Sequence, residues 1–123
     1  MKTILFQERF VGEILSGAKW STLRPGSPRF TVGESASFRH WTGKPYRSPQ
    51  FEFGLSFITS VTPNVYVADE MLSVDFREID GHNLRHFAFS EGFKDPEEMF
   101  SWFSEHYPGG FLGTRYTWKP FGL

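Results

Sequence analysis

The stretch that decides the fold runs from Gly17 to Arg24 and reads GAKWSTLR. The segment before it, residues 8–16, has apolar residues at helical spacing on one face, which predicts a helix. Gly17 stands where that helix would end, because glycine adopts the left-handed backbone of a C-cap without steric cost. Pro25 and the turn residues after it break any regular structure that follows. The stretch is therefore predicted to begin at a helix end and to continue as a loop or short strand.

Strand patterns dominate the first two thirds of the chain. Short runs rich in β-branched and aromatic residues, several of them alternating with polar ones, predict strands at residues 2–6, 34–41, 51–61 and 112–121. Residues 64–72 are weaker and fit either a strand or mixed structure. A tight turn is expected at Asp80-Gly81.

Two further helices are expected in the last third. Residues 83–93 contain a short helix that ends near Gly92, and a second helix follows with Asp95 as N-cap and Pro96 in its first position. The order of elements predicts one α+β domain over residues 1–123, with a small, largely antiparallel β-barrel and flanking helices.

Composition excludes several classes of protein. The chain has 123 residues and no Cys, which excludes a disulfide framework, a thiolate nucleophile and cysteine-ligated zinc. The apolar run at the N-terminus is too short for a secretory signal, and no stretch approaches the length of a membrane span. We therefore expect a soluble, cytoplasmic protein with no membrane partner.

Charge is distributed unevenly along the chain, although the net charge is only −1. Residues 1–60 hold eight Lys and Arg against four Asp and Glu, whereas residues 61–123 hold five against ten. A basic half beside an acidic half could form a positive cleft for a phosphate-bearing ligand. Solvated surface charge is the alternative interpretation.

Three side chains in the opening stretch are chemically capable. Thr22 and Arg24 face the same side of an extended backbone, and Lys19 approaches from the helix end. A lysine that is partly desolvated beside an arginine can lose its proton near neutral pH and act as a base, and a threonine hydroxyl is a nucleophile beside such a base. Arg24 could hold a phosphate or an oxyanion. Alternatively, Lys19 is solvated, Thr22 is a strand residue and Arg24 pairs with an acid.

Several short segments occur in a fixed order along the chain, and together they form a more specific pattern than GAKWSTLR alone. GAKWSTLR fits the pattern G-x-K-x-x-T-x-R, and it is accompanied by FQERF (6–10), TVGE (31–34) and EGF (91–93), followed by a helical segment and HYPGG. In these segments the chain resembles the ASCH domain family, relatives of the PUA RNA-binding domain, and is similar to the small bacterial N4-acetylcytidine amidohydrolases. The resemblance implies a PUA-like barrel; residues 41–50 and 62–82 match little.

The resemblance also implies an activity and a catalytic set. Those hydrolases cleave the amide of N4-acetylcytidine with a lysine, a threonine and a glutamate, which fall on Lys19, Thr22 and Glu91. Lys19 would take a proton from Thr22 or from water, and Glu91 would hold the lysine or orient the substrate amine. Trp20, in place of a small polar residue, and the loop at 41–50 depart from the family pattern and could reshape the pocket.

The same resemblance supports a second interpretation, an RNA-binding module or a ribonuclease that uses the same basic cleft. The expected partner is then single-stranded RNA rather than a modified nucleoside. Trp20, Trp41 and Tyr46 are candidates for stacking on bases. The residues that we expect to bind the substrate in either case are Arg24, Trp20, Arg39, Lys44 and Arg47.

Metal and cofactor sites are not expected. His82 and His86 have the i, i+4 spacing of helical metal ligands, but no third ligand is obvious.

The proposed catalytic set depends on Lys19, which on an isolated loop would be protonated at pH 7 and useless as a base. It needs burial or a partner, so we predict that Lys19, Thr22 and Glu91 converge in one cleft.

Overall fold

The structure is a computed structural model that describes residues 1–121, and it confirms the α+β class. Its strands are β1 (Lys2–Leu5), β2 (Ser21–Pro25), β3 (Ser35–Trp41), β4 (Gln50–Ala68), β5 (Met71–Val74), β6 (Arg77–Ile79) and β7 (Phe111–Trp118). A 3₁₀ turn, η1 (Glu8–Phe10), precedes three helices, which are α1 (Val11–Ser16), α2 (Gly81–Ser90) and α3 (Pro96–His106).

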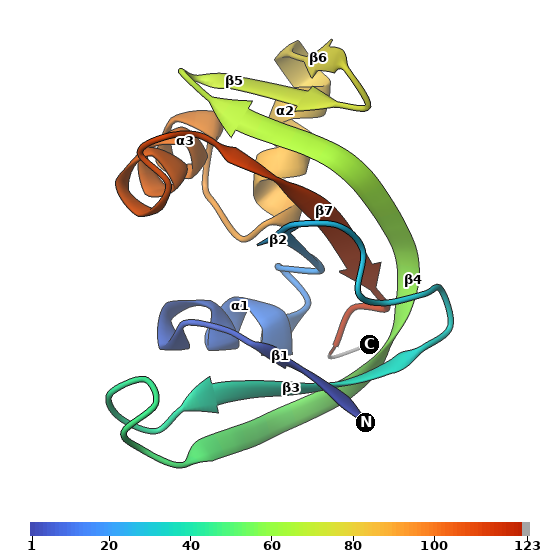
Figure 1. Cartoon of the computed structure of the whole chain (residues 1–123), viewed down its shortest axis with the longest axis vertical. Helices are drawn as coiled ribbons and strands as arrows, with labels where there is room; N and C mark the ends of the chain where they lie inside the picture. Colours follow the sequence, from blue (N-terminus) through green and yellow to red (C-terminus); the bar gives the residue numbers. More distant parts are fainter. Residues whose placement is uncertain (122–123) are drawn as a thin grey trace.

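The strands form one mixed, mostly antiparallel sheet. β3 pairs in parallel with β1 and antiparallel with β4, and every other strand pairing is antiparallel. The second half of β4 pairs with β7 and β5, and β7 also pairs with β2. Figure 1 shows β4 as one long curved strand that joins the two parts of the sheet. The ambiguous segment at 64–72 is therefore the end of β4 and the start of β5.

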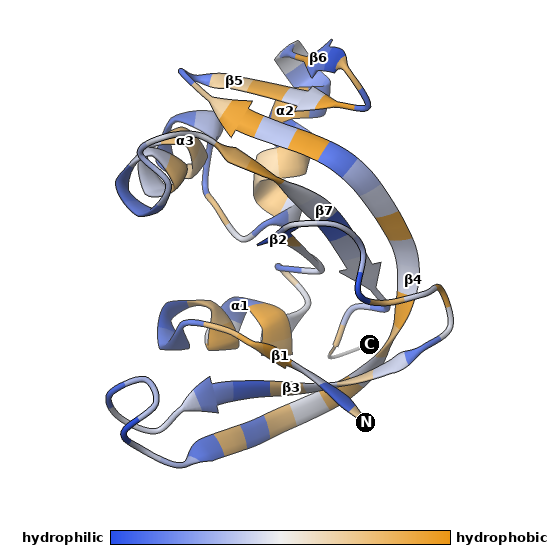
Figure 2. Cartoon of the chain, in the orientation of Figure 1, coloured by the Kyte–Doolittle hydropathy of each residue, from blue (hydrophilic) through white to orange (hydrophobic). Residues whose placement is uncertain are grey.

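The predicted alternation in residues 51–61 is visible along the lower half of β4 in Figure 2. Three of its apolar members nevertheless face outward, since Phe51, Leu55 and Phe57 are all more than half exposed, whereas Phe53 packs against the core 6.1 Å from the ring of Phe6. Gly54 faces inward, where the ring of Phe121 occupies the space that a Cβ atom would need. The missing side chain at Gly54 thus lets the C-terminal segment pack on the inner face.

The predicted helix boundaries are largely confirmed. Gly17 has a φ of 86° and its N–H donates to the carbonyl of Ile14 at 3.1 Å, as a left-handed C-cap requires. The carboxylate of Asp95 accepts from the N–H of Glu98 at 2.8 Å at the start of α3. Gly92 follows α2 with a φ of 92°.

The turn expected at Asp80-Gly81 is wrong, because Gly81 begins α2. Two-residue turns lie earlier, at residues 69–70 between β4 and β5 and at residues 75–76 between β5 and β6. All four turn residues have positive φ, as tight hairpin turns with the twist of β-sheets require. Three of the four are acidic and none is Gly or Asn, so the sequence carries no typical hairpin signal there.

An aromatic core surrounds the place where β1, β3 and the chain end meet. Phe38 packs edge-on against Trp118 at 4.8 Å between ring centroids, and Phe6 lies 5.4 Å from Phe38. Phe10 contacts Phe93 at 5.7 Å, which joins η1 to the segment after α2. None of the helices within residues 1–121 has the length and apolar character needed to cross a membrane.

Candidate active site

Backbone hydrogen bonds bring the opening stretch against the end of α2. The N–H of Lys19 donates to the carbonyl of Glu13 at 2.9 Å, which folds the chain back on α1. The N–H of the next residue, Trp20, donates to the carbonyl of Ser90 at 3.0 Å. These two bonds place Lys19 directly beside Glu91, the residue that follows α2.

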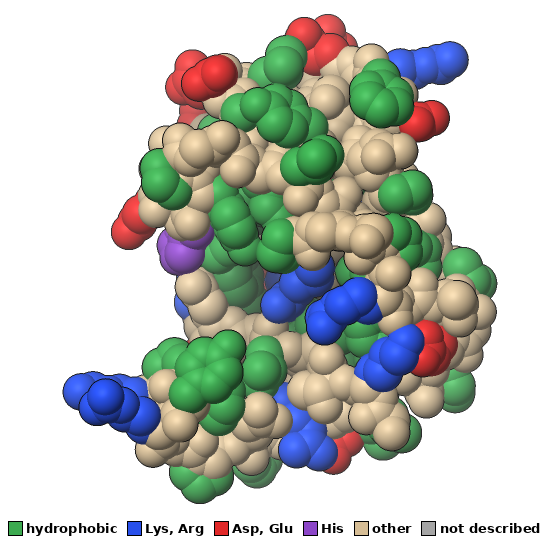
Figure 3. Space-filling view, in the orientation of Figure 1, with side chains coloured by type: hydrophobic (Ala, Val, Ile, Leu, Met, Phe, Trp, Pro, Cys, Tyr) green, Lys and Arg blue, Asp and Glu red, His purple; other side chains and the backbone are tan. Residues whose placement is uncertain are grey.

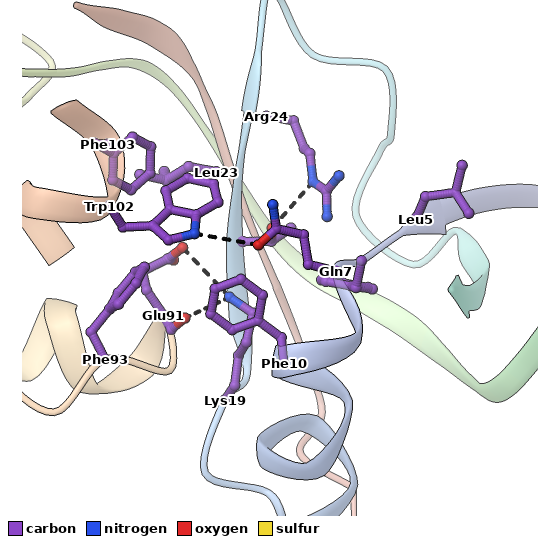
Figure 4. Close-up of a pocket in the computed structure, with 12 residues that line it drawn as sticks. Leu5, Gln7, Phe10, Lys19, Leu23, Arg24, Glu91, Phe93, Trp102 and Phe103 are labelled. Atoms are coloured by element: carbon purple, nitrogen blue, oxygen red, sulfur yellow. Dashed lines mark hydrogen bonds and ion pairs between the residues drawn. The ribbon is translucent and has the colours of Figure 1, made fainter. Parts of the chain in front are cut away.

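The predicted convergence of Lys19, Thr22 and Glu91 is confirmed. Lys19 is 3% exposed and Glu91 is 2% exposed, and Lys19 Nζ lies 3.9 Å from Glu91 Oε1. Lys19 Nζ also donates to the backbone carbonyls of Glu91 at 2.6 Å and Ser21 at 2.7 Å. Figure 4 shows the side chains of Lys19 and Glu91 pointing toward each other, and Thr22 lines the same cavity.

The environment of Lys19 weakens its hold on a proton. Burial lowers the pKa of Lys19 from its ordinary value to about 8, against an opposing effect of the Glu91 charge. The positive charge of Arg24 lowers this pKa further, as the sequence suggested. At pH 7 roughly one molecule in ten then has a neutral amine at this position.

The carboxylate of Glu91 is held by residues that the sequence analysis missed. The hydroxyl of Ser21 donates to Glu91 Oε2, and Arg115 Nε lies 3.6 Å from the same oxygen. Arg115 Nη2 also donates to Ser90 Oγ at 2.7 Å, and Ser90 Oγ lies 3.0 Å from Ser21 Oγ. Arg115 lies on β7, which pairs with β2, so its position beside Glu91 could not be inferred from the sequence alone. Ser21 and Ser90 are sequence neighbours of the predicted site residues Thr22 and Glu91, and this proximity could have identified them.

Thr22 and Arg24 face the same side of β2, as predicted for an extended backbone. Arg24 Nε donates to Thr22 Oγ1 at 3.2 Å, and the guanidinium carbon lies 4.8 Å from the centre of the Phe6 ring. Burial lowers the pKa of Arg24 to about 10, so the group stays positively charged at neutral pH. A cation therefore donates to the oxygen of the candidate nucleophile.

These groups share a cavity of about 170 Å³. Figure 3 shows the face of the molecule hollowed between its upper and lower parts, with Lys and Arg side chains gathered there. The walls are mostly aromatic and apolar, and the residues that line the cavity are Leu5, Phe6, Gln7, Phe10, Lys19, Thr22, Leu23, Arg24, Glu91, Phe93, Trp102 and Phe103.

Gln7 is a further polar lining residue that the sequence analysis did not single out. Its Oε1 accepts from Trp102 Nε1 at 3.4 Å, and its Nε2 lies 3.2 Å from His106 Nε2. Figure 4 shows this contact beside the Lys19–Glu91 pair. The segment after β1 is thereby linked to α3 across the cavity.

The structure does not bring Trp20 and Arg39 into this cavity. The Trp20 ring lies 5.8 Å from the ring of His86, and the guanidinium of Arg115 lies 5.5 Å from the Trp20 ring. Arg39 lies 3.9 Å from the carboxylate of Glu52 on the neighbouring strand. Trp20 therefore contacts Arg115, which holds Glu91, and does not line the cavity.

Lys44 and Arg47 also lie outside the cavity lining, in the loop between β3 and β4. Both side chains are exposed. Tyr46, in the same loop, is 87% exposed and its ring lies 5.1 Å from that of Trp41. The loop thus presents Tyr46 and two cations to solvent, next to the half-buried Trp41 at the end of β3.

His82 and His86 both lie on α2 and are exposed. Within residues 1–121 there is no group of three or more His, Cys, Asp or Glu side chains arranged to hold a metal ion. Arg24, Arg115 and Lys19 instead make the candidate site cationic.

Comparisons of the chain with protein-family models, with curated proteins and with solved structures found no match. The case for a function therefore rests on the geometry of the cavity and on the sequence pattern.

Proposed function

We propose that the protein is an amidohydrolase that acts on an acylated pyrimidine nucleoside such as N4-acetylcytidine. The observation that carries the proposal is the buried Lys19 beside Glu91, in a cavity that Thr22 also lines. A base must combine reach with a pKa near the operating pH, and burial lowers the pKa of Lys19 to about 8. Lys19, Thr22 and Glu91 form the proposed catalytic set.

The hydrogen bonds of Lys19 suit a base. A neutral amine has two N–H groups and one lone pair, and two backbone carbonyls accept from Lys19 Nζ. The lone pair is then left to take a proton from Thr22 or from water. If water attacks, its oxygen adds to the acyl carbon, the C–N bond breaks, Lys19 returns the proton to the departing exocyclic amine, and cytidine and acetate leave. If Thr22 attacks, cytidine leaves in the same way and an acetyl ester of Thr22 remains, and a water that Lys19 deprotonates then hydrolyses this ester to release acetate and restore Thr22.

The other two groups have supporting roles in this proposal. Glu91 holds the lysine and orients the substrate amine, and its charge is balanced by Lys19 and Arg115. Arg24 donates to Thr22 Oγ1 and so favours negative charge on that oxygen.

The size of the cavity favours a small substrate. Typical ligand pockets measure about 300–1,000 Å³, and this cavity is smaller, at about 170 Å³. It suits a pyrimidine ring with its acyl group, while the sugar stays at the mouth. Aromatic walls such as Phe10 and Trp102 provide faces for a flat ring.

We assign the chain to the PUA-like ASCH fold as part of the same proposal, with the curled sheet as its small barrel and a cytoplasmic location. The parallel pairing of β1 with β3, the long curved β4 and the position of Lys19 at the end of α1 support this assignment.

Purified protein mixed with N4-acetylcytidine and followed by ultraviolet absorbance tests the activity. We expect turnover in the wild type and in Lys94→Met, which alters an exposed lysine outside the cavity lining. Lys19→Met has nearly the same volume but no amine, and it should lower kcat by about 10²–10⁴. Equal rates in Lys19→Met and the wild type would refute the assignment of the base.

The loop between β3 and β4 favours a second candidate function, binding of single-stranded RNA. Exposed aromatic rings stack on bases and neighbouring cations meet phosphates, and the loop offers the exposed Tyr46 with Lys44 and Arg47, next to the half-buried Trp41 at the end of β3. Salt-sensitive RNA binding without turnover of the nucleoside would support this candidate over the hydrolase.

A further inference from the structure

Arg24 carries a positive charge that no acid in residues 1–121 neutralises at ion-pair distance. The five ion pairs within 4.0 Å involve Lys2, Arg9, Lys19, Arg39 and Arg115 as their cations. Arg24 is thus the cavity cation without a carboxylate partner. The sequence left open that Arg24 pairs with an acid, and no such ion pair is present within residues 1–121.

Most hydrogen-bond donors of Arg24 are unused. A guanidinium has five N–H groups, and the one on Nε donates to Thr22 Oγ1. No hydrogen bond within residues 1–121 uses the four N–H groups on the two Nη atoms. These atoms are not among the fully enclosed polar atoms that lack a partner, which are Arg115 Nε and Trp118 Nε1. The Nη atoms therefore touch open space, and Arg24 lines the cavity.

The charges around the cavity leave a positive excess. Lys19, Arg24 and Arg115 face only one close carboxylate, that of Glu91, so a positive charge remains even when Lys19 is neutral. Arg29 lies close enough to lower the pKa of Arg24, although burial lowers it most. Figure 3 shows Lys and Arg side chains at the hollow.

The position of Arg24 indicates which end of a substrate it would meet. The backbone of Arg24 lies about 6.6 Å beyond that of Thr22 on β2, because residues two apart on an extended strand have that separation. Its Nε reaches back to Thr22 Oγ1 at 3.2 Å, and Figure 4 shows the guanidinium apart from the amine of Lys19. The amide reacts between Lys19 and Thr22 in the proposed function, so Arg24 faces the end of the substrate away from the acyl group. In a pyrimidine nucleoside that end carries the sugar.

We propose, on the basis of that function, that the substrate is a nucleotide and that Arg24 binds its phosphate monoester. The planar guanidinium can give two parallel N–H···O bonds to a phosphate. Arg29 is exposed and lies outside the cavity lining, so it adds only to the positive field around Arg24. The substrate class is then an acylated pyrimidine nucleoside monophosphate rather than the free nucleoside.

Binding of unacylated ligands tests the phosphate site apart from hydrolysis. Calorimetry would compare cytidine, cytidine monophosphate, inorganic phosphate and acetate on the wild type, Arg24→Gln and the control Arg77→Gln. Arg77 is an exposed residue of β6 outside the cavity lining. We expect the monophosphate to bind at least about tenfold more tightly than cytidine to the wild type and to Arg77→Gln, and no preference in Arg24→Gln.

Two outcomes of this experiment would overturn the proposal. One is equal binding of cytidine and the monophosphate to the wild type. The other is an undiminished preference in Arg24→Gln. Acetate binding that exceeds phosphate binding would assign Arg24 to a carboxylate instead, and would also overturn it. If Arg24→Gln does not fold, Arg24→Lys replaces it, because it keeps the charge but loses the two-pronged contact and should lower the preference.

Hydrolysis separates this role from stabilisation of a transition-state oxyanion. On acetylated cytidine monophosphate, Arg24→Gln should raise KM at least tenfold, whereas the fall in kcat that follows from the lost contact with Thr22 should be the same on the nucleoside and on the nucleotide. A loss of kcat on both the nucleoside and the nucleotide, with KM unchanged, would assign Arg24 to the reacting oxygen and contradict a phosphate role. If neither acylated compound is hydrolysed while the binding preference holds, the proposed function fails and the phosphate site remains.

Discussion

Lys19 Nζ lies 3.9 Å from Glu91 Oε1, although 72 residues separate them in the chain. The separation exceeds a hydrogen bond, and the closest partners of the amine are two backbone carbonyls. Glu91 therefore acts on Lys19 mainly through its charge. This arrangement makes the protonation of Lys19 depend on Glu91 without a direct proton-sharing bond.

The pH dependence of hydrolysis should report the proton of Lys19. Only the neutral amine acts as a base, and burial places the pKa of Lys19 at about 8. We expect kcat/KM to rise tenfold per pH unit below 8 and to level off above it. The Glu91 charge raises the pKa of Lys19, so Glu91→Gln should move the rising limb to lower pH, even though its maximum rate falls.

Rates at a series of pH values on N4-acetylcytidine, for the wild type and Glu91→Gln, check this prediction. A limb that moves to higher pH in Glu91→Gln, or a rate that does not depend on pH between 6 and 9, would contradict a role for Lys19 as the base. Glu97→Gln, at an exposed position outside the cavity lining, serves as the control and should leave the profile in place.

The same pKa predicts how stability changes in alkaline solution. The pKa of Lys19 is lower in the folded protein, at about 8, than in the unfolded chain, where lysine titrates near 10.4. Between these values the unfolded chain binds more protons, so the free energy of unfolding gains a contribution that increases with pH. Below pH 8 the buried charge imposes its full cost, on the order of 3 kcal/mol.

Denaturant titrations from pH 7 to 10.5 on the wild type and Lys19→Met isolate this contribution, because all other groups titrate in both proteins. The difference between the two free energies of unfolding should shift in favour of the wild type as the pH rises. A constant difference would mean that Lys19 has an ordinary pKa in the folded protein.

The start of α3 offers a change that should affect stability alone. Asp95 accepts from the N–H of Glu98 at 2.8 Å, and an N-cap replaced by Ala costs about 1 kcal/mol. Asp95→Ala should therefore lower the midpoint of thermal unfolding by several degrees and leave kcat unchanged at 25 °C. Asp95→Asn retains a capping oxygen and should behave like the wild type. A lowered kcat in a folded Asp95→Ala would show that α3 helps to shape the cavity.

Local signals explain why so much of the secondary structure could be predicted. Gly17 ends α1 because it adopts a left-handed backbone, and Asp95 begins α3 because its side chain caps the first turn of that helix. Both residues act in the structure as the sequence indicated. The turns at residues 69–70 and 75–76 were missed because their positive φ values fall on Asp, Glu and Phe. Those conformations are imposed by the pairing of β4, β5 and β6, which a local pattern does not contain.

The candidate site also has a part that the sequence predicts and a part that depends on strand pairing. Lys19, Thr22 and Arg24 lie within six residues, so their common location follows from one short stretch that runs from the end of α1 into β2. Arg115 comes to Glu91 only through the pairing of β7 with β2, and nothing near it in the sequence points there. Lys44 and Arg47 were expected to bind the substrate, but the loop at 42–49 lies outside the cavity lining. This loop is at the far end of the hairpin formed by β3 and β4.

Gly92 provides the sharpest test of the position of Lys19. A Cβ atom at Gly92 would lie 3.0 Å from Lys19 Cδ and 3.3 Å from Lys19 Cβ, closer than ordinary packing allows. Gly92→Ala should displace the lysine side chain by a few tenths of an ångström. Because a shift of about 1 Å at a catalytic group can cost about 10² in rate, a loss of about tenfold is expected. Gly92 also has a φ of 92°, so the substitution adds backbone strain of about 1–2 kcal/mol.

Gly33 is the matched control, because it has a φ of 91° and open space where its Cβ would be. Gly33→Ala should show the same backbone strain in chemical unfolding and retain its hydrolysis rate. Gly92→Ala should unfold at least as readily, lose rate by about tenfold, and show a displaced rising limb in its pH profile. If the two variants lost equal stability and both kept full rate, Lys19 would not need its observed position, and its assignment as the base would be wrong.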